Sequence, residues 1–300
     1  MINGIINVYK EKGYTSHDVV AKLRGILKQK KIGHTGTLDP DAQGVLPICL
    51  GKGTKICDML TEKDKTYETE MLLGVVTDTQ DTTGNIISKK PVQLDTDEIK
   101  EVILGFIGEY QQIPPMYSAI KVNGKKLYEL AREGKEIERK ARKVIIHHIK
   151  ITNIDFPYVR LIVQCSKGTY IRTLCHDIGY QLGCGGCMNQ LTRTQVGRFE
   201  IQEAKNLNQI EELAKTNAIS SILTEIDEMF LDYPSFTVDS KFNKILLNGN
   251  PIHESMFISK QNLTELPTMI RIYDVGGKFI GIYKWNTEKK NYKPIKIFME

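Results

Sequence analysis

The chain has 300 residues, of which 41% are hydrophobic and 26% charged, and its formal net charge is +5. This length and balance are typical of a globular protein with one large domain, or one domain plus a small appendage, and exclude a disordered or fibrous chain. The N-terminus lacks the basic start and long apolar run of a signal peptide, and no stretch approaches the roughly 18 apolar residues that cross a membrane.

The first part of the chain is predicted to alternate strands and helices. Ile2 to Val8 forms a short apolar run typical of a strand, and Thr15 with Asp18 has the spacing of a helix capping box before an apolar-periodic segment. Val45 to Leu50 predicts a buried strand, and Lys65 to Val76 alternates apolar and polar residues as a half-buried strand does.

The middle of the chain continues this mixture. Asp95 is placed to cap a second helix, whose apolar stripe reaches Ile107. Residues 142–151 and 159–166 predict two strands, and Tyr170 to Leu182 predicts a helix. Because the elements do not follow a regular βαβ period, we expect an α+β fold with a mixed, mainly antiparallel sheet flanked by helices.

The pattern changes near Leu231, where short β-like runs begin to alternate with turns. This pattern predicts a small β-rich C-terminal domain over residues 233–300, following a larger domain over residues 1–230.

Six cysteines are scattered through the chain, which fits reduced thiols in the cytoplasm better than a disulfide scaffold. The Cys184-x-x-Cys187 pair is compatible with zinc, but it lacks a second pair, and a glycine-rich turn explains it equally well. We expect a cytoplasmic protein without a metal.

The stretch GHTGTLDPDAQGVLP, residues 33–47, holds three glycines, two prolines and two aspartates, a composition that no regular element favours. Pro40 pushes the preceding Asp39 into an extended conformation within this loop. A turn aspartate is the ordinary explanation of Asp39 taken alone. His34 in the same loop, and the motifs SKGTYIRTL (166–174) and QIPPMYSAIKVNGKKLYELAREG (112–134), favour a functional site instead.

Residues 121–143, here called the basic segment, hold nine Lys or Arg and four Glu. Such a patch favours a polyanionic partner, whereas a solvated helix face is the alternative explanation. The Pro114-Pro115 entry and the glycines at 124 and 134 favour a semi-independent flap over about residues 114–143.

These motifs together resemble the bacterial tRNA pseudouridine-55 synthase family of the TruB type. The resemblance is carried by the loop at 33–47, by KTYETEMLLGVVTDTQDTTG from residue 65, by the two motifs above, and by LTRTQVGRF from residue 191. It extends over roughly residues 1–230, and the tail from residue 233 resembles the family's small PUA RNA-binding domain more loosely. The implied fold is the pseudouridine synthase catalytic fold, with the flap as a thumb-like insertion.

The resemblance implies that Asp39 is the catalytic carboxylate, whereas Asp41 falls at a variable position of the motif. It makes Arg172 the arginine that pairs with the aspartate and Tyr67 an active-site tyrosine that stacks on the target base. An opposite charge within a few ångströms favours the ionised carboxylate, so we expect Arg172 to keep Asp39 charged.

Further residues are implied to bind the substrate: His34 contacts the T-loop RNA, and Tyr170 and Leu191 line the pocket. The chain departs from the family at Glu11, because the Lys-Pro-x-Gly turn is replaced by Lys10-Glu11-Lys12-Gly13, and this departure bears on the supporting role of Lys10. The cations expected to clamp RNA phosphates without reading sequence are Lys121, Lys125, Lys126, Arg132, Arg139 and Lys140.

The expected reaction is the isomerisation of uridine 55 in the tRNA T loop, in which the base leaves N1, rotates and rejoins the sugar through C5. This reaction needs no redox step or group donor, which agrees with the absence of a GxGxxG or Walker loop from the sequence, and we expect no cofactor. A tRNA-folding factor with secondary catalysis is the alternative, and a metal-assisted hydrolase is less supported. We expect a monomer that acts on tRNA without a membrane or a protein partner.

Overall fold

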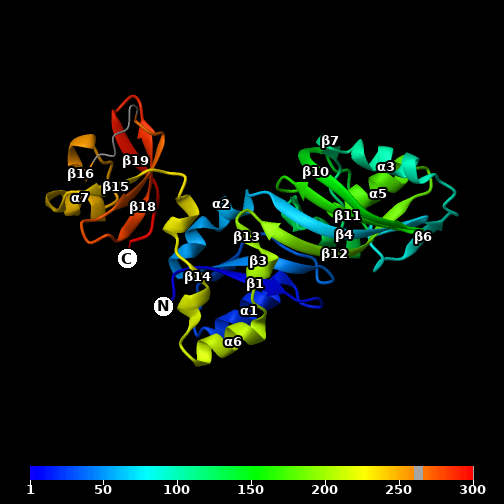
Figure 1. The fold of residues 1–300 in the computed structure, drawn as a ribbon, viewed down its shortest axis with the longest axis horizontal. Helices are drawn as coiled ribbons and strands as arrows, with labels where there is room; N and C mark the ends of the chain where they lie inside the picture. The colour runs from blue at the N-terminus through cyan, green and yellow to red at the C-terminus, as the bar shows by residue number, and fades with distance from the viewer. Residues whose placement is uncertain (260–265, 300) are drawn as a thin grey trace.

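The computed structural model describes residues 1–259 and 266–299, which form a ten-stranded sheet, a five-stranded sheet and two two-stranded sheets, with helices packed on the largest (Figure 1). The larger sheet has the order β14 (Leu223–Thr224), β1 (Gly4–Lys10), β3 (Gln43–Leu50), β12 (Gly186–Val196), β4 (Lys65–Leu73), β11 (Tyr158–Cys165), β10 (Arg142–Asp155) and β7 (Gly108–Gln112). At its margins β2 (Ile32–His34) pairs with β3, and β13 (Phe199–Glu200) pairs with β12.

The pair of β3 with β12 joins the two halves of the larger sheet, β14-β1-β3 and β12-β4-β11-β10-β7. Within that sheet all pairs are antiparallel except β3 with β12, which are parallel and place Arg193 opposite Gly44. A side chain at Gly44 would meet the backbone of Arg193, since an added Cβ would lie 2.2 Å from the Arg193 carbonyl oxygen. The α+β class and the mixed, mainly antiparallel sheet are therefore confirmed.

Two pairs of helices cover the two halves of this sheet (Figure 1). The half around β1 and β3 packs against α1 (Ser16–Ile26) and α6 (Leu207–Lys215), and the half around β4, β10 and β11 packs against α3 (Thr96–Leu104) and α5 (Ile171–Gln181). The predicted capping box of α1 is present, with Thr15 Oγ1 accepting from the Asp18 N–H at 3.0 Å. Helix α3 ends at Leu104, so Ile107 lies past the helix, where it is 43% exposed.

Shorter elements connect these layers. They are the 3-10 helices η1 (Gly51–Ile56), η2 (Ile201–Glu203), η3 (Ile219–Ile222) and η4 (Asp227–Phe230), the helix α2 (Cys57–Thr61), the hairpin β5 (Val75–Thr77) with β6 (Ile86–Lys89), and the hairpin β8 (Lys121–Val122) with β9 (Lys125–Lys126), which leads into α4 (Leu127–Arg132).

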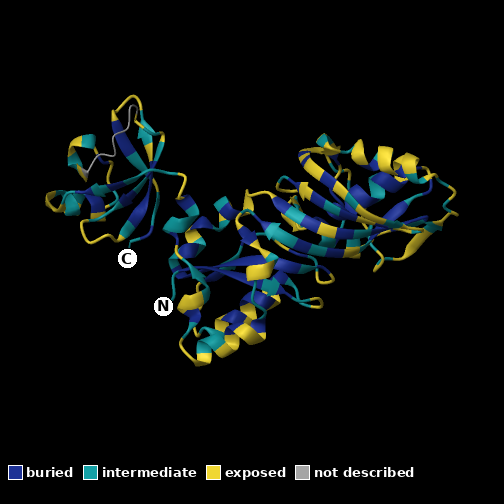
Figure 2. Cartoon of the chain, in the orientation of Figure 1, coloured by how far each residue is buried: buried dark blue, intermediate teal, exposed yellow. Residues whose placement is uncertain are grey.

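The C-terminal part folds as a separate five-stranded sheet with a buried interior (Figure 2). Its order is β16 (Phe257–Ser259), β15 (Ser235–Val238), β17 (Met269–Tyr273), β18 (Phe279–Asn286) and β19 (Asn291–Ile297), and it also carries η5 (Ser240–Phe242), α7 (Asn243–Leu247) and η6 (Glu254–Met256). The exact domain limits near residues 230 and 233 stay a prediction.

The C-terminal sheet contacts the larger unit through both apolar and charged groups. Ile282 and Phe298 pack in one apolar cluster with Val45 of β3. Lys296 Nζ lies 2.8 Å from Asp58 Oδ2 at the start of α2. Among residues 1–259 and 266–299, no helix has the length and apolar character needed to cross a membrane.

Candidate active site

The loop that carries Asp39 is anchored at both ends. It begins at His34, the last residue of β2, and not within an irregular loop as predicted, because the backbone of His34 pairs with Ile48 of β3. The Thr35 N–H then donates to the Pro47 carbonyl at 3.2 Å. Ser16 Oγ, at the start of α1, accepts from the Leu38 N–H at 2.9 Å. Asp39 therefore follows a backbone segment held from two sides.

Lys10 fixes the other side of this loop. The Asp39 carbonyl accepts from the Ala42 N–H at 3.1 Å, which closes a turn over Pro40. The Lys10 side chain is fully buried, and its Nζ donates to the Pro40 carbonyl at 3.2 Å and to the Tyr14 carbonyl at 2.6 Å. Burial lowers the pKa of Lys10 to about 8. The lysine thus supports the turn even though the Pro of the family's Lys-Pro-x-Gly pattern is replaced by Glu11.

Arg172 reaches the Asp39 carboxylate from the first turn of α5. Its Nε lies 3.1 Å from Asp39 Oδ2, and the two side chains differ in exposure, at 6% for Arg172 and 42% for Asp39. By contrast, Asp41 is on the exposed side of the turn. The Asp39 side chain is therefore partly exposed and partly surrounded by protein, while the cation beside it is buried.

Arg172 is itself held on three sides. Its guanidinium donates to the Thr79 carbonyl at 3.1 Å and to the Tyr117 carbonyl at 2.8 Å, and its Nη1 lies 3.5 Å from Asp81 Oδ2. Because Tyr117 lies in the 112–134 motif and Asp81 in the 65–84 motif, Arg172 brings three of the sequence motifs to Asp39. This fixed geometry leaves little freedom for the arginine.

The pKa of the Asp39 carboxyl is raised above its ordinary value of 3.8, and burial is the main cause. Arg172 and Lys10 oppose this shift, whereas Asp81 and Asp41 add to it through like-charge repulsion. Arg172 favours the charged form, as expected, although the protein around the carboxyl outweighs it in the net direction of the pKa shift.

Tyr67 and Leu191 lie on adjacent strands beside this loop. Tyr67 on β4 is 8% exposed and Leu191 on β12 is 9% exposed, and both belong to the apolar cluster that includes Leu38. Burial raises the pKa of the Tyr67 hydroxyl, and the positive charge of Arg193 opposes the shift. The buried positions at 67, 71 and 73 confirm the predicted alternation of this strand.

Tyr170 and His34 occupy the edges of the same region. Tyr170 is the residue before α5, and its backbone N–H donates to Gln112 Oε1 at 2.7 Å. Burial raises the pKa of its hydroxyl. His34 packs edge-on against His17 with ring centroids 5.3 Å apart, and burial lowers its pKa.

Comparison with known proteins identifies the family of the chain. The model of the TruB family pseudouridylate synthase N-terminal domain matches residues 24–171, and that of the tRNA pseudouridylate synthase B C-terminal domain matches residues 172–232. A tRNA pseudouridine synthase B of Lachnoclostridium phytofermentans is 52% identical, with 99% of this chain and 100% of the relative covered. The chain belongs to the TruB family and is a pseudouridine synthase.

Other relatives agree with this TruB assignment. A tRNA pseudouridine synthase B of Clostridium kluyveri is 47% identical over 99% of this chain and 100% of its own length. Among solved structures, the Cbf5–Nop10–Gar1 complex contains a chain with 25% identity and a TM-score of 0.74, which matches 99% of this chain and 85% of its own. An H/ACA RNP bound to a substrate RNA contains a chain of the same fold, with a TM-score of 0.72, 23% identity and the same coverage.

The basic segment of this TruB chain begins next to the site, since Tyr117 binds Arg172 just before it. Some of its cations already have acidic partners: Lys125 Nζ lies 3.2 Å from Glu133, and Arg139 lies 3.1 Å from Glu136. Lys126 Nζ donates to the Tyr128 hydroxyl at 3.1 Å, and the Arg132 guanidinium lies over the same ring. The segment also exposes Lys121 and Lys140 to solvent.

Sequence reasoning missed two residues that the TruB structure places in the site. Asp81 flanks Arg172, and Arg193 is buried beside Tyr67. Both lie inside motifs that the sequence singled out. Arg193 also follows Leu191 at the spacing that puts two strand residues on one face, and this alternation is the signal that could have found it.

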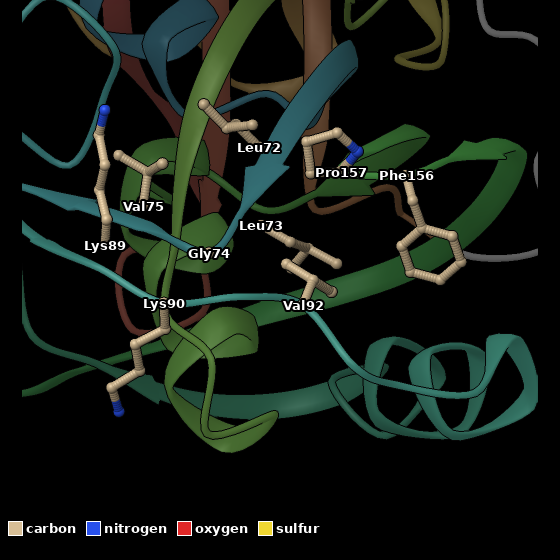
Figure 3. A pocket seen from close by; sticks show the side chains of 9 residues that line it. All are labelled: Leu72, Leu73, Gly74, Val75, Lys89, Lys90, Val92, Phe156 and Pro157. Carbon is tan, nitrogen blue, oxygen red and sulfur yellow. The ribbon is translucent and has the colours of Figure 1, made fainter.

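A cavity lies away from these residues in the TruB fold. It has a volume of about 390 Å³ and lies beyond the end of β4, between residues 89–92 and the Phe156-Pro157 turn (Figure 3). None of the predicted site residues lines it. Among the described residues, no group of three or more His, Cys, Asp or Glu is arranged to hold a metal ion.

Proposed function

We propose that this pseudouridine synthase isomerises uridine 55 in the T loop of tRNA, with Asp39 as the catalytic carboxylate. The pairing of the buried Arg172 with the partly exposed Asp39 at 3.1 Å is the observation that carries the proposal. The names of the relatives support tRNA as the substrate. The position within tRNA rests on the resemblance of the 33–47 loop to the motif of the pseudouridine-55 synthases.

The reaction breaks the bond from N1 of uracil to C1′ of the ribose, rotates the base and forms a bond from C5 to C1′, after which C5 loses its proton and N1 gains one. A carboxylate beside an anomeric carbon can attack it or stabilise the cation-like sugar. Asp39 is suited to this role because its side chain is 42% exposed while Arg172 fixes its orientation. A group held in one orientation loses little entropy when the reaction occurs.

The other predicted residues receive roles around the flipped base. Tyr67 and Leu191 line the pocket floor, and Tyr67 stacks on the base after it leaves the T loop. Tyr170 lines the side next to Arg172. His34, with His17 behind it, occupies the space from which the base departed.

Two further parts of the chain, the basic segment and the C-terminal sheet, are proposed to bind RNA. We assign the phosphate clamp to the basic segment, and the hydrogen bond from Arg172 to the Tyr117 carbonyl, shortly before that segment, supports a position near the site. The C-terminal sheet is proposed as a PUA-like domain that adds RNA contacts. The six free cysteines support a reducing cytoplasmic location, and we propose that the protein acts there as a monomer.

The experiment that tests the function is a comparison of tRNA from cells with and without this protein. Carbodiimide labelling followed by mass spectrometry detects pseudouridine at each position. We expect position 55 to lose pseudouridine without the protein and to regain it when the intact gene is restored. Unmodified uridine at position 55 in both strains with pseudouridine lost elsewhere would assign the enzyme to another site.

A further inference from the structure

Strand β7 is tied to helix α5 by a buried side chain that the proposed mechanism does not yet use. Gln112, the last residue of β7, is 1% exposed. Its Oε1 accepts from the Tyr170 N–H at 2.7 Å, and its Nε2 donates to the Tyr170 carbonyl at 3.0 Å. One side-chain amide therefore pairs with both backbone groups of Tyr170, as a residue of a neighbouring antiparallel strand would.

Tyr170 is the residue from which α5 starts. Its backbone is extended, with φ −100° and ψ 110°, and its side chain does not cap the helix. Its carbonyl also accepts the first backbone bond of the helix, from the Leu174 N–H at 3.0 Å. Helix ends fray more readily than helix interiors. The two bonds to Gln112 hold this end of α5, and Arg172 lies only two residues further along the chain.

Gln112 also lies at the base of the flap. Its partner on β10 is Arg142, so the chain leaves the larger sheet after Gln112 and returns to it at Arg142. Just beyond this pair, Arg139 Nη1 donates to the Pro114 carbonyl at 3.2 Å and joins the two arms of the flap. The Gln112 amide consequently connects the base of the flap, which carries the basic segment, to the start of α5.

The chain just after Gln112 makes a second contact with Arg172. Arg172 Nη2 donates to the Tyr117 carbonyl at 2.8 Å, while its Nε lies 3.1 Å from Asp39 Oδ2. The backbone of the arginine is thus held through Tyr170, and its guanidinium is held between Tyr117 and Asp39. Hydrogen bonds weaken steeply as their geometry departs from the optimum, so a small displacement of the first turn of α5 would weaken the contact with Asp39.

We propose that Gln112 is a positioning residue of the isomerisation, one that sets Arg172 against Asp39 by holding the Tyr170 backbone to the base of the flap. This inference rests on the proposed function, because Asp39 is the group whose orientation is controlled. Gln112 is buried, so it acts through Tyr170 and Arg172 and not on the RNA. A glutamine amide suits this task because it carries a donor and an acceptor on one planar group.

Gln112→Met in the full-length protein tests the proposal. Methionine has a side chain of similar length but no donor and only a weak acceptor. Single-turnover release of tritium from a T-loop stem that contains 5-tritiated uridine gives the rate constant, and filter binding gives the Kd. We expect the rate constant at saturating enzyme to fall by about tenfold or more and the Kd to change by less than about threefold. A folded variant with the wild-type rate constant would overturn the proposal.

The pH–rate profile separates a positioning role from a structural one. The charged groups that act on the Asp39 carboxyl are Arg172, Lys10, Asp81 and Asp41. Burial raises the pKa of this carboxyl, and Arg172 is the charged group that opposes the shift most. If Gln112→Met displaces Arg172, the pKa of Asp39 rises further and the acid limb of the profile moves to higher pH. A lower rate with the acid limb unmoved contradicts the proposal, because Arg172 would then have kept its place.

Gln29→Met is the matched control. The Gln29 amide makes the same pair of bonds elsewhere, since its Oε1 accepts from the Ile2 N–H at 2.9 Å and its Nε2 donates to the Ile2 carbonyl at 3.2 Å. Figure 1 shows the N-terminus far from α5. We expect Gln29→Met to keep the rate constant and the acid limb of the wild type. Equal losses of rate in the two variants would make the effect a general cost of removing such a pair, and the proposal would fail.

Gln112→Asn serves if the methionine variant does not fold. Asparagine keeps the amide but is one methylene group shorter, so it cannot keep both bonds to Tyr170. We expect a lower rate constant and an acid limb at higher pH, and wild-type values for both would refute the role of Gln112. If the wild type itself releases no tritium from uridine 55, the proposed function fails. An active wild type with an equally active Gln112 variant sinks only the further inference.

Discussion

Arg172 and Asp39 form an ion pair between a buried cation and a partly exposed carboxylate, with Nε 3.1 Å from Oδ2. The two residues come from different halves of the larger sheet: Asp39 precedes β3, and Arg172 lies in the first turn of α5, which packs over β4 and β12. The parallel pairing of β3 with β12 brings these halves together. Because β3 pairs with β12, Arg172 reaches Asp39 from the other half of the sheet and fixes the orientation of its carboxylate.

Asp39→Asn should abolish isomerisation while tRNA binding stays within about tenfold, or roughly 1.4 kcal/mol. Asparagine keeps the shape of the side chain and loses the charge that acts on the sugar. Tritium release and filter binding measure the two effects. Asp41→Asn is the matched control, because Asp41 is exposed in the same turn, and it should keep wild-type activity. Substantial turnover by Asp39→Asn would place the essential carboxylate elsewhere.

The acid limb of the pH–rate profile should move to lower pH in Asp81→Asn. Activity is lost as the pH falls through the pKa of Asp39, because protonation removes the carboxylate. That pKa is raised above 3.8, and Asp81 is one of the groups that raise it. Removing the Asp81 charge therefore lowers the pKa of Asp39. Loss of the Asp81 carboxylate should also reduce the rate on the plateau of the profile, since Arg172 loses an ionic partner at 3.5 Å. Single-turnover rates between about pH 4 and 8 test the sign, and a limb displaced to higher pH would contradict it.

Tyr67→Phe should bind tRNA like the wild type and react more slowly, whereas Tyr67→Ala should also bind more weakly. Stacking on a flipped base is worth about 1–3 kcal/mol, and alanine loses all of it. Because Tyr67 is 8% exposed, alanine should also lower the free energy of unfolding, by about 3–5 kcal/mol as for other large buried aromatic residues. Denaturant titration measures this cost separately. Equally poor binding by both variants would make the hydroxyl the RNA contact.

Local sequence signals predicted the elements well. The Thr15 capping box, the alternating burial of β4 and the helix after Tyr170 are all present, because each depends on neighbouring residues alone. Helix α3 ends earlier than its apolar stripe suggests, since Gly105 is its C-cap and the residues after it turn away.

Relations between distant segments could not be predicted in this way. The parallel register of β3 with β12 depends on the close approach of Gly44 to the Arg193 backbone, which no local pattern encodes. The net pKa shift of Asp39 is equally nonlocal, because it depends on how much protein surrounds the carboxyl and on Asp81 as well as on Arg172. Arg193 was overlooked for the same reason: its partners lie on β3, on β4 and in the Gly36 turn.

Removal of two exposed lysines from the basic segment should make tRNA binding less dependent on salt. Lys121 and Lys140 are exposed, whereas Arg139 donates to the Pro114 carbonyl at 3.2 Å and is best left intact. If both lysines neutralise phosphates, Lys121→Gln with Lys140→Gln should reduce the slope of log affinity against log salt by about 1.4 to 1.8. Both positions lie on the surface, so the thermal unfolding midpoint of the free protein should not change.

The control for this prediction removes the same number of charges away from the basic segment. Lys100 on α3 and Lys215 on α6 are both exposed and pair with acidic residues of their own helices. Lys100→Gln with Lys215→Gln should leave the salt slope as in the wild type, although the net charge changes equally. Filter binding of a T-loop stem across a salt series measures both double variants. Equal reductions of the salt slope in the two double variants would indicate a general effect of net charge. An unchanged slope in the Lys121→Gln, Lys140→Gln variant would make residues 121–143 a solvated face, with the phosphates bound elsewhere on the protein.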